Sequence, residues 1–342
     1  MTHIKTFFSQ FTFALLLLIF LYSNTFAQND LEYNYVKTST QSVEREGTLR
    51  YMTFHDHSVA NLPYHEHYYR DPLTYTIETY SLTSLSAQWY LNSRTLAYAY
   101  IPYVSNKREI DNSLNEVVKK SGLGDIIIGG KHFLYNSALY KQNPSFKQYL
   151  VLGVGLKLPS GSYSDFDEAK REIEPTLQPG SGTMDFLITG DYQFHYNRFT
   201  LQAAANYSIT QKNKYTYQYG NQINASIEAL YELEFNPNID IVPNMALQYT
   251  DAESNAINGA LIDGSSTTSA FEFLGTGGQM LWGSLGLAVK MNRTQVQFDY
   301  FLLMSEDLIG SQLPHKNRWE VGVRWDFGKG NVLSTKGRRN VE

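Results

Sequence analysis

Residues 185–210 read DFLITGDYQFHYNRFTLQAAANYSIT, and their order of apolar and polar residues decides the fold class. In the first half, apolar residues such as Phe186 and Ile188 alternate with polar ones, and after the break at 196–198 the alternation resumes at Phe199. This two-residue period predicts two long β-strands joined by a tight turn. One face of this hairpin is apolar and the other carries ionisable groups, which is typical of a wall between lipid and water.

The same alternation recurs along most of the chain, and it predicts about twelve strands. It is clearest over residues 223–235, where Glu228, Glu232 and Glu234 share one face. Three carboxylates on one face would be costly in a dry core but cost little beside water. The predicted connections alternate between short and long, apart from a short one near residues 212–216, and outer-membrane barrels sort their connections in this way. We therefore predict an all-β protein, a single antiparallel up-and-down transmembrane barrel with short periplasmic turns and long extracellular loops.

Four segments carry finer expectations. Residues 104–123 contain apolar residues at helical spacing, so a short helix is predicted in this connection. One or two helical turns are predicted at residues 168–174. Pro243 lies inside a predicted strand and indicates a bulge or an irregular position, because proline has no N–H to donate. The first strand is predicted at residues 48–54, where the alternation is poor.

The first 27 residues are predicted to be a secretory signal peptide. Lys5 precedes an apolar run at residues 11–22, and a small-residue exit ends at Ala27, after which cleavage is expected. A membrane anchor is the alternative, but the apolar run is shorter than the roughly 20 residues that a spanning helix needs. The rest of the chain divides into a polar periplasmic lead-in at 28–47, the barrel at 48–328 and a polar tail at 329–342.

Composition narrows the class of protein. The chain has 26 Tyr, 19 Phe and 4 Trp, yet its mean hydropathy is −0.35, as expected when each apolar residue of a strand has a polar neighbour. It has no cysteine, so lipid attachment and disulfides are excluded. The net charge of −5 gives no support to nucleic-acid binding. An exported chain without a transmembrane helix is either soluble in the envelope or a barrel; the aromatic content favours a barrel in contact with outer-membrane lipid.

Three segments rich in Gly and Pro carry a family resemblance. They are GLGD at residues 122–125, GLKLPSG at 155–161 and QPGSG at 178–182, which precedes Asp185. With them, the chain resembles the phenol-degradation meta-pathway, or transporter-like, family of outer-membrane barrels over residues 82–327. The resemblance implies a barrel that moves small, often hydrophobic, molecules across the outer membrane. The chain departs from the family pattern in its histidine-rich first loop.

One set of candidate residues comprises ionisable side chains that the alternation places on the inner face of the barrel. Mixed signs on neighbouring strands can line a conduit and tune what passes, or can pair with one another and fill a closed lumen. We favour an open conduit. The lumen-lining candidates are Lys131, Lys157, Asp185, Asp191, Glu228, Glu232, Asp299, Arg318, Glu320, Arg324 and Asp326.

Four of the eight histidines lie close together in two pairs, His55 with His57 and His65 with His67. In an extended segment, residues i and i+2 point the same way, so each pair presents two imidazoles on one side. A hairpin that joined the pairs would make a nitrogen-rich site for Zn or Cu. The alternative is an exposed polar loop in which the histidines are incidental. No other cofactor is expected.

An enzymatic function is not predicted. A hydrolase needs a nucleophile, a base and an orienting group in one place, but His132, His195 and His315 are single histidines without a nucleophile motif around them. Residues 275–278, GTGG, lack the Lys and Ser/Thr of a phosphate-binding loop. The sequence therefore predicts a passive channel or transporter for small-molecule solutes, and the alternative is a non-transporting barrel whose loops bind a metal ion or a partner.

Binding of zinc or copper tests the histidine-pair hypothesis. We expect the purified protein to bind the ion, and a variant with both His65→Ala and His67→Ala to bind less, because half of the imidazole ligands are gone. Equal uptake by the two proteins, or no uptake by either, would contradict the hypothesis.

Overall fold

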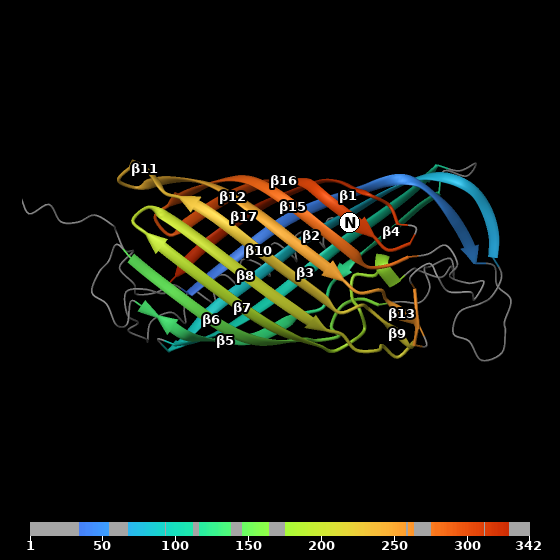
Figure 1. Ribbon diagram of the computed structural model, residues 1–342, viewed down its shortest axis with the longest axis horizontal. Coiled ribbons are helices and arrows are strands. Elements are labelled where there is room, and N and C mark those ends of the chain that lie inside the picture. Colours follow the sequence, from blue (N-terminus) through green and yellow to red (C-terminus); the bar gives the residue numbers. More distant parts are fainter. Residues whose placement is uncertain are drawn as a thin grey trace, which may run out of the picture.

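The computed structural model describes the chain in nine ranges, and almost every regular element in them is a β-strand (Figure 1). Within these ranges, no helix is long and apolar enough to cross a bilayer. The predicted signal peptide, the turns expected at 168–174, the four paired histidines and the tail at 329–342 lie outside the described residues. The described ranges are 34–54, 68–92, 94–111, 116–137, 146–163, 175–257, 259–262, 275–310 and 312–327.

Twelve antiparallel strands form one closed barrel, as predicted. Neighbours along the chain pair with one another, and the last strand pairs with the first, so the sheet has no free edge. The strands are β1 (Asn34–Phe54), β2 (Tyr68–Asn92), β3 (Thr95–Asp111), β5 (Ile127–Asn136), β6 (Phe146–Lys157), β7 (Asp185–Tyr196), β8 (Phe199–Ile209), β10 (Gln222–Tyr231), β12 (Ile239–Ala252), β15 (Gly278–Met291), β16 (Thr294–Leu308) and β17 (His315–Phe327).

Shorter elements extend the barrel or lie at one of its ends. β4 (Glu116–Leu123) pairs with β3, and β11 (Leu233–Asn236) pairs with β12. A small separate sheet and a 3-10 turn lie at the end where the connections are long (Figure 1). These elements are β9 (Tyr217–Gln218), β13 (Ala256–Ile257), β14 (Ala260–Leu261) and η2 (Pro175–Leu177).

The two ends of the barrel differ in their connections. At one end, β7–β8 and β15–β16 are joined by two-residue turns in which Asn197 and Asn292 have φ of 52°. Asparagine tolerates this left-handed conformation better than most residues. The connection between β8 and β10, predicted to be short near residues 212–216, runs from 210 to 221 and contains β9 at the other end. By the rule for outer-membrane barrels, the short turns are periplasmic and the longer connections extracellular.

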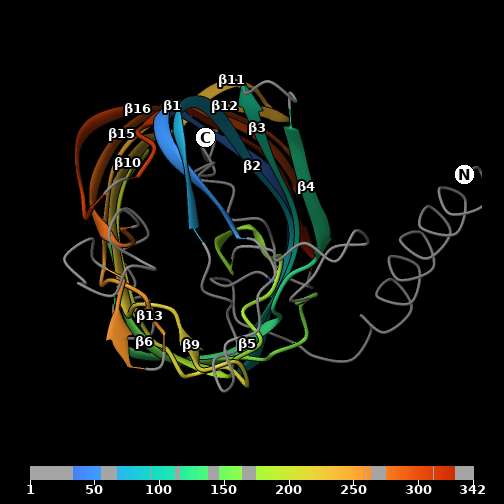
Figure 2. The same cartoon turned by 90° about the vertical axis from the view of Figure 1, so that its right-hand side faces the viewer.

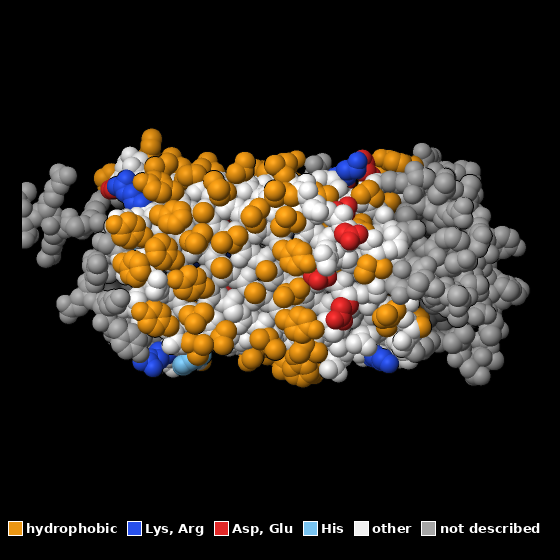
Figure 3. All heavy atoms as spheres, viewed as in Figure 1, with side chains coloured by type: hydrophobic (Ala, Val, Ile, Leu, Met, Phe, Trp, Pro, Cys, Tyr) orange, Lys and Arg blue, Asp and Glu red, His pale blue; other side chains and the backbone are white. Residues whose placement is uncertain are grey.

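The barrel is apolar outside and polar inside. Outward residues such as Val154, Met245 and Leu285 have 66%, 60% and 61% of their surface exposed, whereas inward Asp185 and Asp299 are buried. Hydrophobic side chains cover the middle of the face shown in Figure 3, and charged side chains lie towards its ends. A soluble protein has the opposite arrangement. A closed barrel with an apolar belt can span a membrane because all its backbone groups are paired within the sheet.

The N-terminal boundary of the barrel differs from the prediction. Residues 34–47 belong to β1 instead of a periplasmic lead-in, and they pair with both β17 and β2. Their outward face carries Val36, Thr38, Thr40 and Ser42, since these residues pair with the outward side of β17. A face made mostly of hydroxyl residues gives almost no hydropathy contrast with the inner face. The strand is held by its two neighbours, and such pairing is invisible to a local pattern.

The helix predicted within residues 104–123 is wrong. β3 continues to Asp111 and β4 returns from Glu116, so the described parts of this connection form a hairpin that prolongs the barrel wall. Lys107 lies opposite Lys119, and Tyr103 lies opposite Leu123. The apolar residues have helical spacing, but the strand ladder of β3 offers hydrogen-bond partners for the backbone that a short isolated helix lacks.

Pro243 causes the irregularity that was predicted, but only on one side of β12. Towards β15 the register is regular. Towards β10 the ladder stops at the Leu230–Asn244 pair, and with β11 it starts again at Leu233–Ile241. The interruption lies opposite Pro243, which has no N–H to donate. The amide of Glu232 instead donates to the carbonyl of Arg198 at 2.9 Å.

Two neighbouring alanines of β8 test the orientation of the wall. Ala205 faces outwards and is exposed, and Ala204 lies opposite Asp191 on the inner face. We expect Ala205→Arg to lower the free energy of unfolding from lipid vesicles by roughly 2–4 kcal/mol, because it places a charge in the lipid. The matched variant Ala204→Arg should lose much less, since its charge faces the lumen. Denaturant titrations of both variants give the comparison; equal losses would contradict the assignment of faces.

Candidate functional site: the lumen and the mouth of the barrel

The strand register places ten of the eleven ionisable candidates on the inner side of the barrel. Two lie at the end with long connections, Lys157 at the end of β6 and Asp185 at the start of β7. Glu232 lies between β10 and β11, near the periplasmic turns. The others lie along the wall, with Lys131 on β5, Asp191 on β7, Glu228 on β10, Asp299 on β16, and Arg318, Glu320, Arg324 and Asp326 on β17.

Lys131 and Asp191 form an ion pair on the inner wall, with 2.7 Å between Nζ and Oδ2. The strands that carry them are separated by β6, so the lysine side chain crosses that strand at Gly153. A Cβ on Gly153 would lie 2.6 Å from Lys131 Cγ and 2.6 Å from Thr189 Oγ1. The absence of a side chain at this glycine therefore lets the pair form.

Arg318 joins distant parts of the wall. Its Nη1 donates to Gln248 Oε1 of β12 at 3.0 Å, and its Nη2 donates to Gln41 Oε1 of β1 at 3.2 Å. Its guanidinium carbon lies 4.0 Å from the centre of the Phe301 ring, a cation–π contact. β17 and β12 are separated by β16 and β15 in the barrel. The arginine therefore connects strands on both sides of β17 along the inner wall.

Several other charges of the lumen also form ion pairs. Lys37 of β1 lies 3.5 Å from Glu320, and Arg324 lies 2.7 Å from Asp326. Lys290 of β15 lies 3.6 Å from Glu232 near the periplasmic end. The first pair joins β1 to β17, the second lies within β17, and the third joins β15 to the segment between β10 and β11. The inner wall thus carries charges of both signs.

One part of the inner wall is apolar and aromatic. Leu96, Phe133 and Val151, from β3, β5 and β6, form a buried cluster. Tyr90, Tyr98 and Tyr149 are partly buried and pack against it. The tip of the Tyr98 side chain lies over two glycines: a Cβ on Gly129 would be 2.4 Å from its Cζ, and a Cβ on Gly155 would be 2.3 Å from its hydroxyl oxygen. The lumen therefore has a tyrosine-covered side as well as a charged one.

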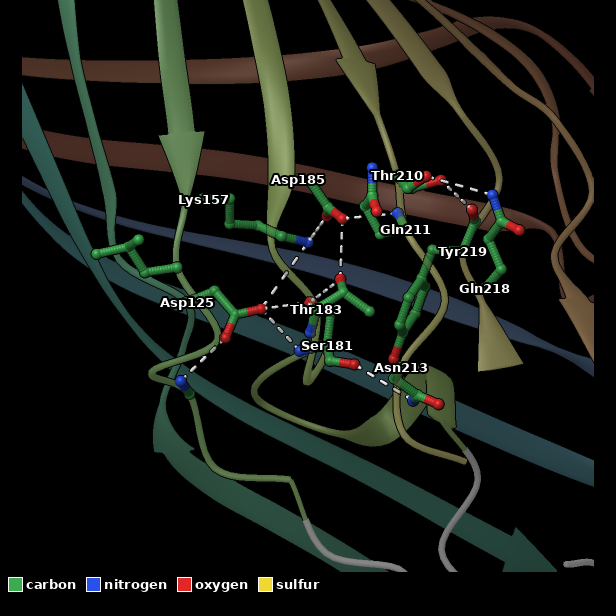
Figure 4. Close-up of polar contacts among 12 residues, drawn as sticks. Asp125, Lys157, Ser181, Thr183, Asp185, Thr210, Gln211, Asn213, Gln218 and Tyr219 are labelled. Atoms are coloured by element: carbon green, nitrogen blue, oxygen red, sulfur yellow. Dashed lines mark hydrogen bonds and ion pairs between the residues drawn. The ribbon is translucent and has the colours of Figure 1, made fainter. Parts of the chain in front are cut away.

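At the extracellular mouth, Asp125 draws two connections together (Figure 4). Its Oδ1 accepts a hydrogen bond from the amide of Gly161 at 2.9 Å. Its Oδ2 accepts from the amide of Ser181 at 2.8 Å and from the Ser181 hydroxyl at 2.5 Å. These residues come from the three segments that carry the family resemblance. The Gly and Pro motifs therefore serve one shared contact at the mouth.

Lys157 lies between two carboxylates in this cluster, as Figure 4 shows. Its Nζ forms an ion pair with Asp185 and lies 3.8 Å from Asp125 Oδ2. Asp185 Oδ1 also accepts from the Thr183 hydroxyl at 2.9 Å and from the amide of Gln211 at 3.0 Å. Because both carboxylates are buried, these contacts replace the water that each charge loses.

The two connections cross where each has a glycine. A Cβ on Gly161 would lie 2.6 Å from the Cα of Gly180, and a Cβ on Gly180 would lie 2.7 Å from the Cα of Gly161. Real side chains do not come this close, so only glycine fits at either position. The crossing seats residues 175–183, which we call the strap, within the mouth. The strap contains η2, whose light-green ribbon lies within the ring of strands in Figure 2.

Histidine chemistry has little support in the described part of the chain. His132 and His195 are each hydrogen-bonded to a threonine, at 3.1 Å and 2.8 Å, and His315 pairs with Glu306. These three histidines lie on different strands. Among the described residues, no group of three or more His, Asp and Glu side chains has the geometry of a metal site. His55, His57, His65 and His67 lie outside these residues, so the metal hypothesis stays a prediction.

Sequence reasoning missed the contacts that hold the strap. In the sequence, Asp125 appears only as the last residue of a Gly-rich motif, and no pattern marks Asn106 or Tyr219. Asn106 Nδ2 donates to the carbonyl of Leu177 at 3.0 Å, and the Tyr219 hydroxyl donates to the carbonyl of Pro175 at 2.7 Å. The partners are 71 and 44 residues apart. The one available signal was that three Gly and Pro motifs stand at ends of strands on the same side of the barrel.

One solved structure shares the fold. An outer membrane channel from Pseudomonas putida F1 is 13% identical, with a TM-score of 0.52, and the match covers 89% of this chain and 100% of that one. The beta domain of the Bordetella autotransporter Brka is 10% identical, with a TM-score of 0.44, and the match covers 86% of this chain and 100% of that one. At these identities the likeness concerns the fold alone. The closed barrel and its apolar belt place the protein in the bacterial outer membrane.

Sequence comparison gives one result. A family profile described as "Putative MetA-pathway of phenol degradation" matches residues 73–299, which is most of the barrel. Among curated proteins, none matches this chain in sequence.

Asp125→Asn tests the cluster at the mouth. The amide replaces one acceptor oxygen by a donor and removes the charge, so buried donors of residues 161 and 181 lose a partner. We expect the free energy of unfolding to fall by roughly 1–3 kcal/mol, and the strap to become accessible to protease on intact cells. The control is Asp191→Asn, in an ion pair whose carboxylate is 34% exposed, where a loss below about 1 kcal/mol is expected. A larger loss at the control position would contradict this assignment.

Proposed function

This chain belongs to the family described as "Putative MetA-pathway of phenol degradation", and on this premise we propose that it is an outer-membrane channel for the passive movement of small molecules. The proposal accounts for the inner wall of the barrel. A barrel that served only as an anchor would need an apolar belt, but would not need charged side chains on its inner face. Channels of this type have a polar interior.

One observation carries the proposal: the strands alternate between the belt and a lumen lined by ionic and amide side chains. Ion pairs such as Lys131–Asp191 and Lys37–Glu320 leave both partners partly exposed on the inner side. Such exposure is inexpensive when water fills the lumen and costly when it does not. A hydrated path through the barrel therefore fits these residues best.

The proposed solutes are small molecules, hydrophobic ones among them. Ion pairs such as Lys131–Asp191 and Lys37–Glu320 place charges of both signs along the wall, so the lumen offers polar contacts to solutes of either charge or none. The tyrosines at positions 90, 98 and 149 offer aromatic surface beside these charges. Aromatic rings bind both apolar groups and polar edges. A small solute with an apolar body and a polar group can use both sides of the wall.

The main alternative is a non-transporting barrel whose extracellular loops capture a metal ion or a partner. The histidine pairs near residues 55–67 motivate it, and zinc or copper binding tests it. We propose no enzymatic activity, because His132, His195 and His315 lie on separate strands and each is bonded to a neighbouring side chain. The two proposals differ in one property: a channel passes solutes through a bilayer and a receptor does not.

Adjacent residues of β10 test the channel. Ser226 faces the lumen and Ile227 faces the lipid with 45% of its surface exposed. The chain has no cysteine, so a thiol introduced at either position is the only one that reacts. We expect a charged thiosulfonate reagent to lower the conductance of Ser226→Cys in a planar bilayer, because the adduct occupies the path, and to leave that of Ile227→Cys unchanged.

Uptake by liposomes gives the solute class in the same preparations. A size series of uncharged sugars is compared with small aromatic alcohols, and empty liposomes are the control. Folded protein that conducts no ions and passes no solute of either series would contradict the channel proposal. Passage through wild type together with equal block at both cysteine positions would contradict the assignment of the lumen as the path.

A further inference from the structure

The strap is held at its far end by two hydrogen bonds to opposite parts of the barrel. Asn106 of β3 faces the lumen and binds the carbonyl of Leu177. Tyr219, directly before β10, binds the carbonyl of Pro175. Around the barrel, β3 and β10 are separated by four strands on one side and by six on the other. The strap therefore spans the part of the mouth that lies between these two positions.

The two ends of the strap are fastened unequally. At its base, Ser181 donates two hydrogen bonds to Asp125, and the adjoining Asp185 forms an ion pair with Lys157. Hydrogen bonds to charged groups are stronger than neutral ones. At the far end, each anchor is a single neutral hydrogen bond from a side chain to a carbonyl. Breaking those two bonds removes both of these far-end anchors and leaves the contacts of the base in place.

Burial shows that the strap occupies space inside the mouth. Leu177 and Gln178 are 3% and 7% exposed, and residues 179–181 are buried as well. A connection lying over the outer rim would expose these side chains to water. Their burial at the mouth means that a solute entering from outside must pass beside the strap or displace it.

We propose that the strap is the outer gate of the channel, and that Asn106 and Tyr219 determine the largest solute that enters. This inference rests on the channel function proposed above. In the closed position the strap limits entry to solutes that fit beside η2. Release of the two anchors lets the far end swing about the Asp125 base, and larger solutes then enter.

The test compares Asn106→Ala, Tyr219→Phe and the double variant with wild type, in planar bilayers and in liposome swelling with a size series of uncharged sugars. Loss of two hydrogen bonds is expected to shift the closed-to-open equilibrium by about thirty-fold. The double variant should therefore show a higher mean conductance and pass larger sugars, and each single variant should lie between it and wild type. Tyr219→Phe keeps the ring and removes only the hydroxyl, so it still tests the loss of one anchor if Asn106→Ala folds poorly.

Two control variants separate the gate from other effects. Asn206→Ala removes an inner-wall amide that binds Asn224 and does not touch the strap. Tyr249→Phe removes an outer-wall hydroxyl that binds Asp251. Both should keep the wild-type size limit. A shift with Asn206→Ala as large as with the double variant would overturn the proposal, because any widening of the lumen would then suffice.

The remaining outcomes distinguish the gate from the channel. If wild type conducts and the double variant keeps the same conductance and size limit, the gate is wrong and the channel stands. If all folded forms are silent towards ions and sugars, the channel function fails and the gate fails with it. Folding of each variant is checked by the shift in gel mobility between heated and unheated samples, which a closed barrel shows and an unfolded chain does not.

Discussion

Backbone hydrogen bonding in the bilayer is the constraint on which the rest of this structure depends. No water reaches the hydrocarbon core, so every N–H and C=O there needs a partner within the protein. The pairing of β1 with β17 meets this need by leaving no open edge. Once the sheet is closed, alternate residues must face lipid and lumen. The apolar belt and the polar interior both follow from closure.

The polar interior creates a second requirement, which is met by small residues. Long charged side chains must fit inside a narrow cylinder without clashing with the opposite wall. Gly153 lets Lys131 cross β6 to Asp191, and Gly129 and Gly155 accept the ring of Tyr98. These glycines sit within strands, where glycine is otherwise unfavourable. Their positions are explained by the side chains that lie over them.

The mouth and the wall of the barrel are held together by different kinds of interaction. The wall is held by repetitive backbone pairing, whereas the mouth is held by side chains that meet only once. Asp125 accepts from two separate connections, and Lys157 forms ion pairs with both Asp125 and Asp185. This arrangement fixes the base of the strap firmly and leaves its far end on two neutral bonds.

The sequence by itself determined the fold class, the number of strands and the sides on which residues lie, because a two-residue period is a local property of each strand. Residues 185–210 and 223–235 show that pattern without help from the rest of the chain. It failed at residues 34–47, where threonine and serine face outwards, and at 104–123, where a helical spacing lies in a β-hairpin. In both places the pairing partner decides the structure.

Tertiary structure alone decided the mouth. Asn106 and Leu177 are 71 residues apart, and nothing near either one indicates the other. The Gly and Pro motifs marked the ends of strands but not the carboxylate of Asp125 on which they converge. For Pro243, the sequence and the structure each supplied a part. The missing N–H predicted an irregularity, but only the strand register shows that the interruption falls on the side of β10 and β11. Alternation is a property of residues that are neighbours in the sequence. A contact between loops that are distant in the sequence forms only when the folded barrel brings the loops together.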